Sequence, residues 1–436
     1  MIAHELVLAH SSNDNGRGKM FQFAFLLFHA AISADMANSI SATCNRAMKL
    51  YGVVPKSEGQ MQYLRFLSAY NESLDFWLLT AVINEEAHVL VSADDENDFR
   101  KDLFSQRMEF YVKNPNIGGC AEGGRTERKA QYRSKESLDF TRRYLSYSDI
   151  NRYIDYLGRK YADMVTVTNV GKSYEGRTLK TVTIGQSQQS KTILIDAGIH
   201  AREWIAPATA LYVINRLVQH ANENRDLLSN LTWIILPLVN PDGYEYSFKS
   251  NKFWRKTRQP YGRCIGTDGN RNFNFHWGEK GASKYECVNT FAGPRPFSEP
   301  ETQTVRDLLL AKNDTIKFYL SLHSYGRMLL YPWGYKKDLP RKWRNMDVVA
   351  RAGASAMKRS HRVDYRVGGA AKVLYEAAGA SDDYAIAVAK IPIAITMELP
   401  GDERGFHPVE SKISIFIQEA FTGIRAMALK MMEIQV

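Results

Sequence analysis

The feature that most limits the fold of this 436-residue chain is the alternation of strand-like and helix-like segments after residue 146. Apolar, β-branched runs typical of buried strands alternate with helical patterns, and we find no internal repeat. The strands are expected at 165–170, 179–184, 191–196, 231–238, 316–322 and 393–397, and the helices at 147–161, 207–221, 301–312, 343–359 and 410 to the end. This alternation predicts one large α/β domain with a mixed sheet, which we place at residues 137–436.

A smaller unit precedes this domain. Residues 48–114 show a short α+β pattern of three strands and two helices, none of which carries an evident chemical motif. Residues 115–136 then form a linker that begins Gly-rich and continues as the basic, polar run Arg125–Arg133. Such a run is either an ordinary solvated linker or a site for a trypsin-like protease.

The first 34 residues have the layout of a leader and secretory signal peptide. Arg17 and Lys19 flank an apolar core that starts at Met20, and small residues follow near Ser33 and Ala34. The core of about 13 residues is too short to span a membrane. We therefore expect a secreted, extracellular protein without a membrane anchor, whose true start is either Met1 or Met20.

Charge and cysteine content limit the partners and the compartment. The net charge is +10, but the basic residues are scattered and no nucleic-acid motif is present, so we expect no nucleic-acid partner. Four cysteines fit a secreted protein with up to two disulfides in any of three connectivities. Cys264 and Cys287 are the favoured local pair, whereas Cys44 and Cys120 bracket the smaller unit. Asn71, Asn230 and Asn313 begin the N-glycosylation pattern Asn-x-Ser/Thr.

Polar residues follow three of the predicted strands. His200 and Glu203, three residues apart, come after the strand 191–196, while His323 and Glu398 come directly after the strands 316–322 and 393–397. An isolated His-x-x-Glu is more often two surface residues than a metal site. Residues at several strand ends converge at one sheet edge, however, and two His with one Glu are the ligands of a catalytic zinc ion that keeps an open position.

From about residue 137 onward, the chain resembles the zinc carboxypeptidase family, most closely the pancreatic-type A and B enzymes. Seven motifs match in order. They are Ser173-Tyr-Glu-Gly-Arg177, Gly198-Ile-His-Ala-Arg-Glu-Trp-Ile205, Asn240-Pro-Asp-Gly243, Phe253-Trp-Arg-Lys-Thr-Arg258, Asn270-Arg-Asn272, Leu322-His-Ser-Tyr325 and Leu329-Leu-Tyr-Pro332. The resemblance implies an eight-stranded mixed sheet flanked by helices, preceded by a ferredoxin-like activation domain.

The resemblance also implies how the site works. His200, Glu203 and His323 would hold one zinc ion, and Asp268 would orient His200 from outside the ligand set. Glu398 would be the general base that takes a proton from the zinc-bound water and passes it to the leaving amine.

Other residues would bind the substrate, a peptide or protein C-terminus. Arg255 would stabilise the oxyanion, and Asn270, Arg271 and Tyr375 would grip the terminal carboxylate, since a guanidinium group fits a carboxylate well. An internal peptide bond lacks that carboxylate, so the resemblance implies an exopeptidase. Further substrate-binding residues implied by the resemblance are Arg202, Tyr325 and Gly334.

The pocket for the terminal side chain decides which residue is removed. Asp382 aligns with the position that is apolar in A-type and Asp in B-type enzymes, and Gly334 and Ala370 keep the walls small. We therefore expect removal of C-terminal Lys or Arg. The alternatives are that Asp382 points away while Asp383 caps a helix, or A-type specificity for apolar and aromatic residues.

The smaller unit resembles the family's activation segment more loosely. Cleavage by a trypsin-like protease near Arg125, Arg128 or Arg133 would then release a monomeric enzyme from its zymogen. Two other hypotheses are a catalytically silent peptide-binding homologue, although no ligand or base is missing, and a zinc amidohydrolase for non-peptide amides, which the intact carboxylate clamp disfavours.

Overall fold

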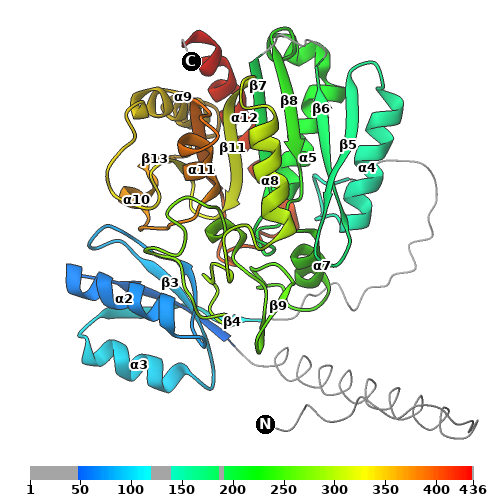
Figure 1. Ribbon diagram of the computed structural model, residues 1–436. Coiled ribbons are helices and arrows are strands. Elements are labelled where there is room, and N and C mark those ends of the chain that lie inside the picture. Colours follow the sequence, from blue (N-terminus) through cyan, green and yellow to red (C-terminus); the bar gives the residue numbers. More distant parts are fainter. Residues whose placement is uncertain (1–47, 119–138, 186–190, 435–436) are drawn as a thin grey trace, which may run out of the picture. The chain divides into compact units, whose positions relative to one another are not determined.

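An eight-stranded mixed sheet dominates the computed structural model, which describes residues 48–118, 139–185 and 191–434. Its strands are β5 (Val165–Lys172), β6 (Thr178–Ile184), β7 (Lys191–Ala197), β8 (Leu231–Leu236), β11 (Ile316–Ser324), β12 (Met328–Tyr331), β13 (Arg366–Gly369) and β14 (Ile393–Leu399). They lie in the order β13-β12-β14-β11-β7-β8-β6-β5, and Figure 1 shows β11, β7, β8, β6 and β5 side by side. The predicted fold class is confirmed.

The central strands of the sheet are parallel. β14, β11, β7 and β8 run in the same direction, whereas β12 is antiparallel to β14 and β6 is antiparallel to β8. Parallel strands are buried on both faces, which explains why these four read as continuous apolar runs in the sequence. Their carboxyl ends meet at one edge of the sheet, where α/β proteins place their sites.

Helices cover both faces of the sheet. Alternate side chains along a strand point to opposite faces. Ile193 and Ile195 of β7 accordingly pack in the core under α4 (Tyr147–Lys160), α5 (Ile205–Gln219), α9 (Trp343–His361) and α12 (Glu410–Glu433). Leu194, between them, belongs to the core on the other face, under α8 (Pro300–Ala311) and α11 (Ser381–Ala387).

Residues 48–117 form a separate four-stranded antiparallel sheet. The strands β1 (Met48–Val54), β2 (Asp75–Leu78), β3 (Ala87–Ser92) and β4 (Glu109–Ile117) lie in the order β2-β3-β1-β4, with helices α2 (Glu58–Tyr70) and α3 (Glu96–Ser105) between them in sequence. We call this unit the activation segment, after the family segment that it resembles in sequence. Tyr51, Leu64 and Phe99 are central to its own hydrophobic core.

Two details of this unit differ from the sequence interpretation. The strand β2 was not expected, and β4 continues to Ile117 through residues interpreted as the start of the linker. β4 is an edge strand, where a residue such as Pro115, which lacks an N–H group, is tolerated. The leader, Cys44, Cys120 and the basic run Arg125–Arg133 lie outside the described residues.

Short elements and loops complete the chain around the sheet edge. Asn240, expected in a turn, instead caps helix α7 (Pro241–Lys249) by accepting a hydrogen bond from Gly243 N at 2.9 Å. The hairpin β9 (Pro260–Tyr261) and β10 (Cys264–Ile265) precedes the short 3-10 helix η3 (Gly269–Arg271), and a disulfide joins Cys264 to Cys287.

Candidate active site

Three adjacent strands deliver the site. His323 and Glu398 lie within β11 and β14 and pair directly across the two strands, rather than following them as expected from sequence. His200 and Glu203 lie in the turn between β7 and α5. This turn starts at Gly198, whose φ of +67° favours glycine and where an added Cβ atom would approach a Leu side-chain carbon to 2.8 Å.

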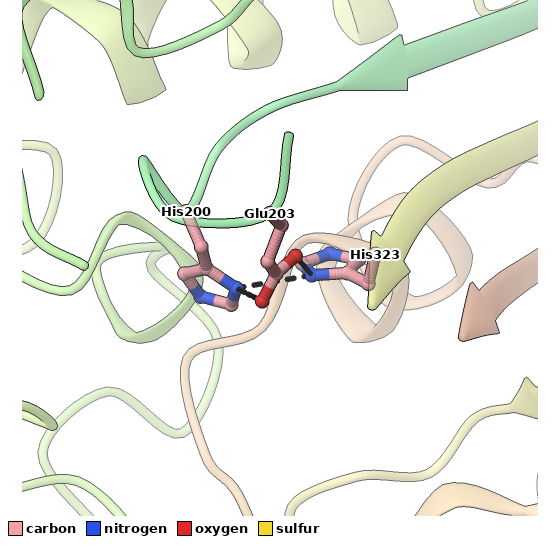
Figure 2. A group of neighbouring side chains, drawn as sticks. All are labelled: His200, Glu203 and His323. Carbon is pink, nitrogen blue, oxygen red and sulfur yellow. Dashed lines mark hydrogen bonds and ion pairs between the residues drawn. The ribbon is translucent and has the colours of Figure 1, made fainter. Parts of the chain in front are cut away.

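Two histidines and one glutamate converge on one point (Figure 2). His200 Nδ1 lies 2.7 Å from Glu203 Oε1, His323 Nδ1 lies 3.1 Å from Glu203 Oε2, and the two Nδ1 atoms are 3.1 Å apart. All three side chains are buried. Neutral imidazole nitrogens and carboxylate oxygens are zinc ligands. One such atom from each of the three residues lies within 4.8 Å of the other two, close enough for the three to share one ion. These residues therefore fit a single zinc ion.

Asp268 connects the metal group to the rest of the site. Its Oδ1 atom lies 3.1 Å from His200 Nε2 and accepts from Asn270 N at 2.9 Å, while Oδ2 accepts from Arg255 Nε and Nη2 at 3.1 and 2.9 Å. Burial alone would raise the pKa of Asp268, but Arg255, Arg271 and His200 hold it well below its usual range. A charged carboxylate thus fixes both His200 and Arg255.

Glu398 is a half-buried residue beside the metal group, and its Oε2 atom is buried. Burial raises its pKa to about 8, with His323 opposing this shift and Glu203 adding to it. Its Oε2 atom has no hydrogen-bond partner among the described residues. An uncommitted carboxyl oxygen next to a metal site is suited to accept a proton during a reaction.

A cationic group lies beside the metal group. Arg271, on η3, donates from Nη2 to Tyr375 Oη at 3.1 Å and from Nε to Gly281 O at 2.8 Å. Asn270 Oδ1 accepts from Ser381 N at 2.9 Å. The three side chains predicted to grip a carboxylate are therefore adjacent, and Tyr375 also packs against the hydrophobic core of the activation segment.

One cavity of about 120 Å³ connects these groups. It is lined by the metal group (His200, Glu203 and His323), by Glu398 and Arg255, and by the clamp, the name we give to Asn270, Arg271 and Tyr375. Asp382, Gly334, Ala370 and Tyr325 complete its lining among the candidate residues. Every candidate site residue except Arg202 and Asp268 therefore lines this cavity, and Asp268 contacts it through His200 and Arg255.

Asp382 lies buried in the cavity wall, at the start of α11. Its carboxylate accepts hydrogen bonds from Thr396 Oγ1 at 3.0 Å and Asp383 N at 2.9 Å, and it has no ion pair with any cation of the described residues. The neighbouring Asp383 instead accepts from Gly334 N and Tyr335 N, at 2.8 and 2.9 Å. Burial raises the pKa of Asp382, an effect that a bound cation would reverse.

The contacts between the activation segment and the site were not predicted from the sequence. Asp75 of β2 binds Arg202 Nη1 at 2.6 Å and Asn289 Nδ2 at 2.7 Å, which places Arg202 under the segment. His88 Nδ1 of β3 lies 2.7 Å from Tyr325 Oη. Residues 76–79 also line the cavity. One sequence feature could have indicated these contacts: Asp75 is a charged residue directly before the apolar run 76–79.

Fold and site together define a class of protein: an α/β metal-dependent hydrolase with a cationic group beside its metal group. Comparisons with known proteins give the family. The profile of the zinc carboxypeptidases matches residues 150–423, and that of the carboxypeptidase activation peptide matches residues 51–119. The chain belongs to the zinc carboxypeptidase family and carries an activation peptide, as the sequence resemblance implied.

Individual relatives are similar over most of the chain. Carboxypeptidase B of Astacus astacus is 42% identical over 67% of this chain and 97% of its own length, and zinc carboxypeptidase A 1 of Drosophila melanogaster is 33% identical over 86% and 89%. The crystal structure of carboxypeptidase A from Helicoverpa armigera, 30% identical, has a TM-score of 0.80 over 88% of this chain and 98% of its own. That of thrombin-activatable fibrinolysis inhibitor, 31% identical, has a TM-score of 0.77 over the same shares.

The family membership fixes the activity in general terms. The protein is a zinc-dependent metallocarboxypeptidase, a peptide hydrolase made as a zymogen whose activation peptide implies activation by a protease. Within the described ranges, we find no helix with the length and apolarity needed to cross a bilayer.

Proposed function

We propose that the protein is a secreted B-type carboxypeptidase zymogen that, once activated, removes C-terminal Lys or Arg. The observation that carries this specificity is the buried carboxylate of Asp382, which lines the cavity without a cationic partner among the described residues. A Lys or Arg side chain would supply that cation, whereas an apolar side chain would leave the charge unpaired. Leaving one partner of such a buried pair unmatched costs roughly 2–5 kcal/mol.

Each residue of the site has a proposed role in hydrolysis. His200, Glu203 and His323 would hold zinc, which would act as a Lewis acid and polarise the scissile carbonyl. Glu398 takes a proton from the attacking water and passes it to the leaving amine, for which its raised pKa is suited. Arg255, held by Asp268, places a fixed cation where negative charge develops on the carbonyl oxygen.

Exopeptidase selectivity comes from the clamp. Asn270, Arg271 and Tyr375 bind the terminal carboxylate, with Arg202 and Tyr325 contributing to the substrate groove once the activation segment has left. In the zymogen, Asp75 and His88 contact these last two residues. Substrate therefore reaches the groove only after a trypsin-like protease has cut near Arg125–Arg133.

Secretion of a monomeric enzyme is part of the proposal. The disulfide between Cys264 and Cys287 favours an oxidising compartment, and the basic and apolar residues before residue 34 have the order of a signal peptide. Expression of the full chain in a eukaryotic secretory host, followed by size measurement of the zymogen in the medium, tests this part. Retention of the chain inside the cell would contradict it.

Hydrolysis of two blocked dipeptides tests the specificity, one ending in Arg and one in Phe, before and after trypsin treatment of the zymogen. We expect activity only after trypsin and a higher kcat/KM for Arg. The Asp382→Ala variant should lose the preference for Arg, whereas Asp307→Ala, an exposed control on α8, should keep it. A preference of the activated wild-type enzyme for Phe would establish A-type specificity instead.

A further inference from the structure

Two exposed asparagines begin the N-glycosylation pattern at the same edge of the sheet. Asn230 directly precedes β8, and Thr232 stands two positions after it. Asn313 lies in the turn between α8 and β11, and Thr315 stands two positions after it. Both asparagines are exposed, so an oligosaccharide attached to either side chain would extend into solvent. The third sequon, at Asn71, belongs to the activation segment and would leave with it.

The turn around Asn313 is held by its backbone and not by the asparagine. Lys312 O accepts hydrogen bonds from Thr315 N at 3.0 Å, Ile316 N at 2.9 Å and Thr315 Oγ1 at 3.1 Å. No hydrogen bond of the described residues uses the Asn313 side chain. Its modification would therefore leave the turn unchanged.

Both sequons lie at the edge of the sheet opposite the active site. β8 and β11 flank β7 and are parallel to it, so residues 230 and 313 precede the amino ends of strands separated by one strand. The zinc ligand His323 lies eight residues beyond Thr315 along β11. At about 3.3 Å per residue, this separates the two by roughly 26 Å, so sugars at this edge would not obstruct the substrate.

The turn also contains a peptide bond that a protease activating the enzyme could cut. Lys312 is exposed, and its peptide bond to Asn313 lies in a surface turn, the kind of segment that proteases cut. A protease specific for basic residues, which the proposed activation at Arg125–Arg133 requires, would recognise Lys312 as well. A bulky group on the very next residue would hinder the approach of that protease to this bond.

We propose that Asn230 and Asn313 carry N-linked oligosaccharides, and that the one on Asn313 shields the Lys312–Asn313 bond from the activating protease. The inference rests on the proposed secretion and tryptic activation. In the transfer, the side-chain nitrogen Nδ2 forms a bond to C1 of an oligosaccharide supplied on a lipid diphosphate. The bond from C1 to the diphosphate breaks, the lipid diphosphate leaves, and the amide loses one proton.

The first experiment asks whether the two asparagines are modified. The full chain is expressed in a eukaryotic secretory host, recovered from the medium and treated with peptide N-glycosidase in ¹⁸O-labelled water, which converts each occupied asparagine to labelled aspartate. Peptide mapping should find label at positions 230 and 313. Thr315→Ala should lose the label at Asn313, and the matched variant Thr315→Ser, which keeps the sequon, should retain it. Secreted protein in which neither position carries label would overturn the proposal. A chain retained in the cell would overturn the proposed secretion as well.

The second experiment tests shielding. Secreted wild type and Asn313→Gln, which removes the acceptor but keeps Thr315, are incubated with trypsin, and the fragment that starts at residue 313 is quantified over time by mass spectrometry. We expect several-fold faster cutting in the variant, equal initial kcat/KM after activation, and no such cut in the double variant Lys312→Gln/Asn313→Gln. Equal cutting of occupied wild type and Asn313→Gln would overturn the shielding, and activation that fails in both would overturn the proposed zymogen mechanism instead.

Discussion

Glu398 is the residue on which the proposed chemistry most depends. The Glu398→Gln change keeps the size of the side chain but removes its ability to accept a proton. We expect kcat to fall by about 10²–10⁴-fold, the usual contribution of a general base, with the zinc content unchanged. Turnover of the Arg-ending dipeptide and metal analysis of the purified variant measure the two quantities. Turnover close to that of the wild type would assign the base to another residue.

Asp268 has a different function, since it supports other residues and does not line the cavity. In Asp268→Asn the amide can still accept one hydrogen bond, but the negative charge that orients His200 and Arg255 is lost. We expect zinc to bind about 10–100-fold more weakly, as is typical when the partner of a metal-bound histidine is removed. Competition with a chelator measures the affinity. Unchanged affinity together with reduced kcat would limit Asp268 to the positioning of Arg255.

At the scale of single residues, the sequence predicted those side chains whose function follows from their place on a strand. His323 and Glu398 were proposed because each is a polar residue that directly follows an apolar, strand-like run. Asp75 was missed because its partner Arg202 lies 127 positions away, and only tertiary packing brings the two together. Thr396, which binds Asp382, was missed because a threonine within a strand is unremarkable in sequence.

Strand β3 of the activation segment carries a group whose protonation should weaken the zymogen. Burial, with a smaller contribution from Lys113, lowers the pKa of His88 to about 4, while Glu86 opposes the shift. His88 Nε2 lies 2.9 Å from Glu86 Oε1, and Nδ1 contacts Tyr325. Because the pKa is lower in the folded than in the unfolded state, near 6.5, the stabilisation is complete above pH 6.5 and is lost as the pH falls through 4.

We therefore expect the free energy of unfolding of the full chain to decrease by about 2 kcal/mol more in wild type than in His88→Gln between pH 6.5 and pH 4. Urea denaturation at a series of pH values measures this difference. His220→Gln serves as the matched control, because that histidine is partly exposed and lies outside the activation segment. Parallel pH profiles for wild type and His88→Gln would contradict the prediction.

At the scale of elements, periodicity predicted the long helices and the central parallel strands closely, because burial on one or both faces determines their composition. It failed for β2, β12 and β13, which have only four residues each, and for the end of β4, where Pro115 and two asparagines have the composition of a loop. In both cases pairing with neighbouring strands, rather than local preference, decides the conformation. The clamp segment 268–271 is likewise ordered by its side-chain contacts.

For the whole molecule, the metal should contribute to stability as well as to activity. A ligand that binds only the folded state stabilises it by about 4 kcal/mol when present at 1,000 times its Kd. Treatment of the activated enzyme with a chelator should abolish hydrolysis and lower the melting temperature, and added zinc should restore both. Calorimetry and the dipeptide assay provide the measurements. Full activity in the chelated, metal-free protein would contradict a zinc mechanism.

Tyr375 packs against the core of the activation segment. We expect this contact to keep the enzyme inactive for a time after the chain has been cut. A nick in the linker breaks one peptide bond but leaves Tyr375 and the Asp75–Arg202 pair in place. The nicked complex should stay silent until the segment departs, so the lag before turnover would reflect a dissociation rate rather than the protease concentration. Dilution would then favour activity, and free activation segment added back in excess would act as a reversible inhibitor of its own enzyme.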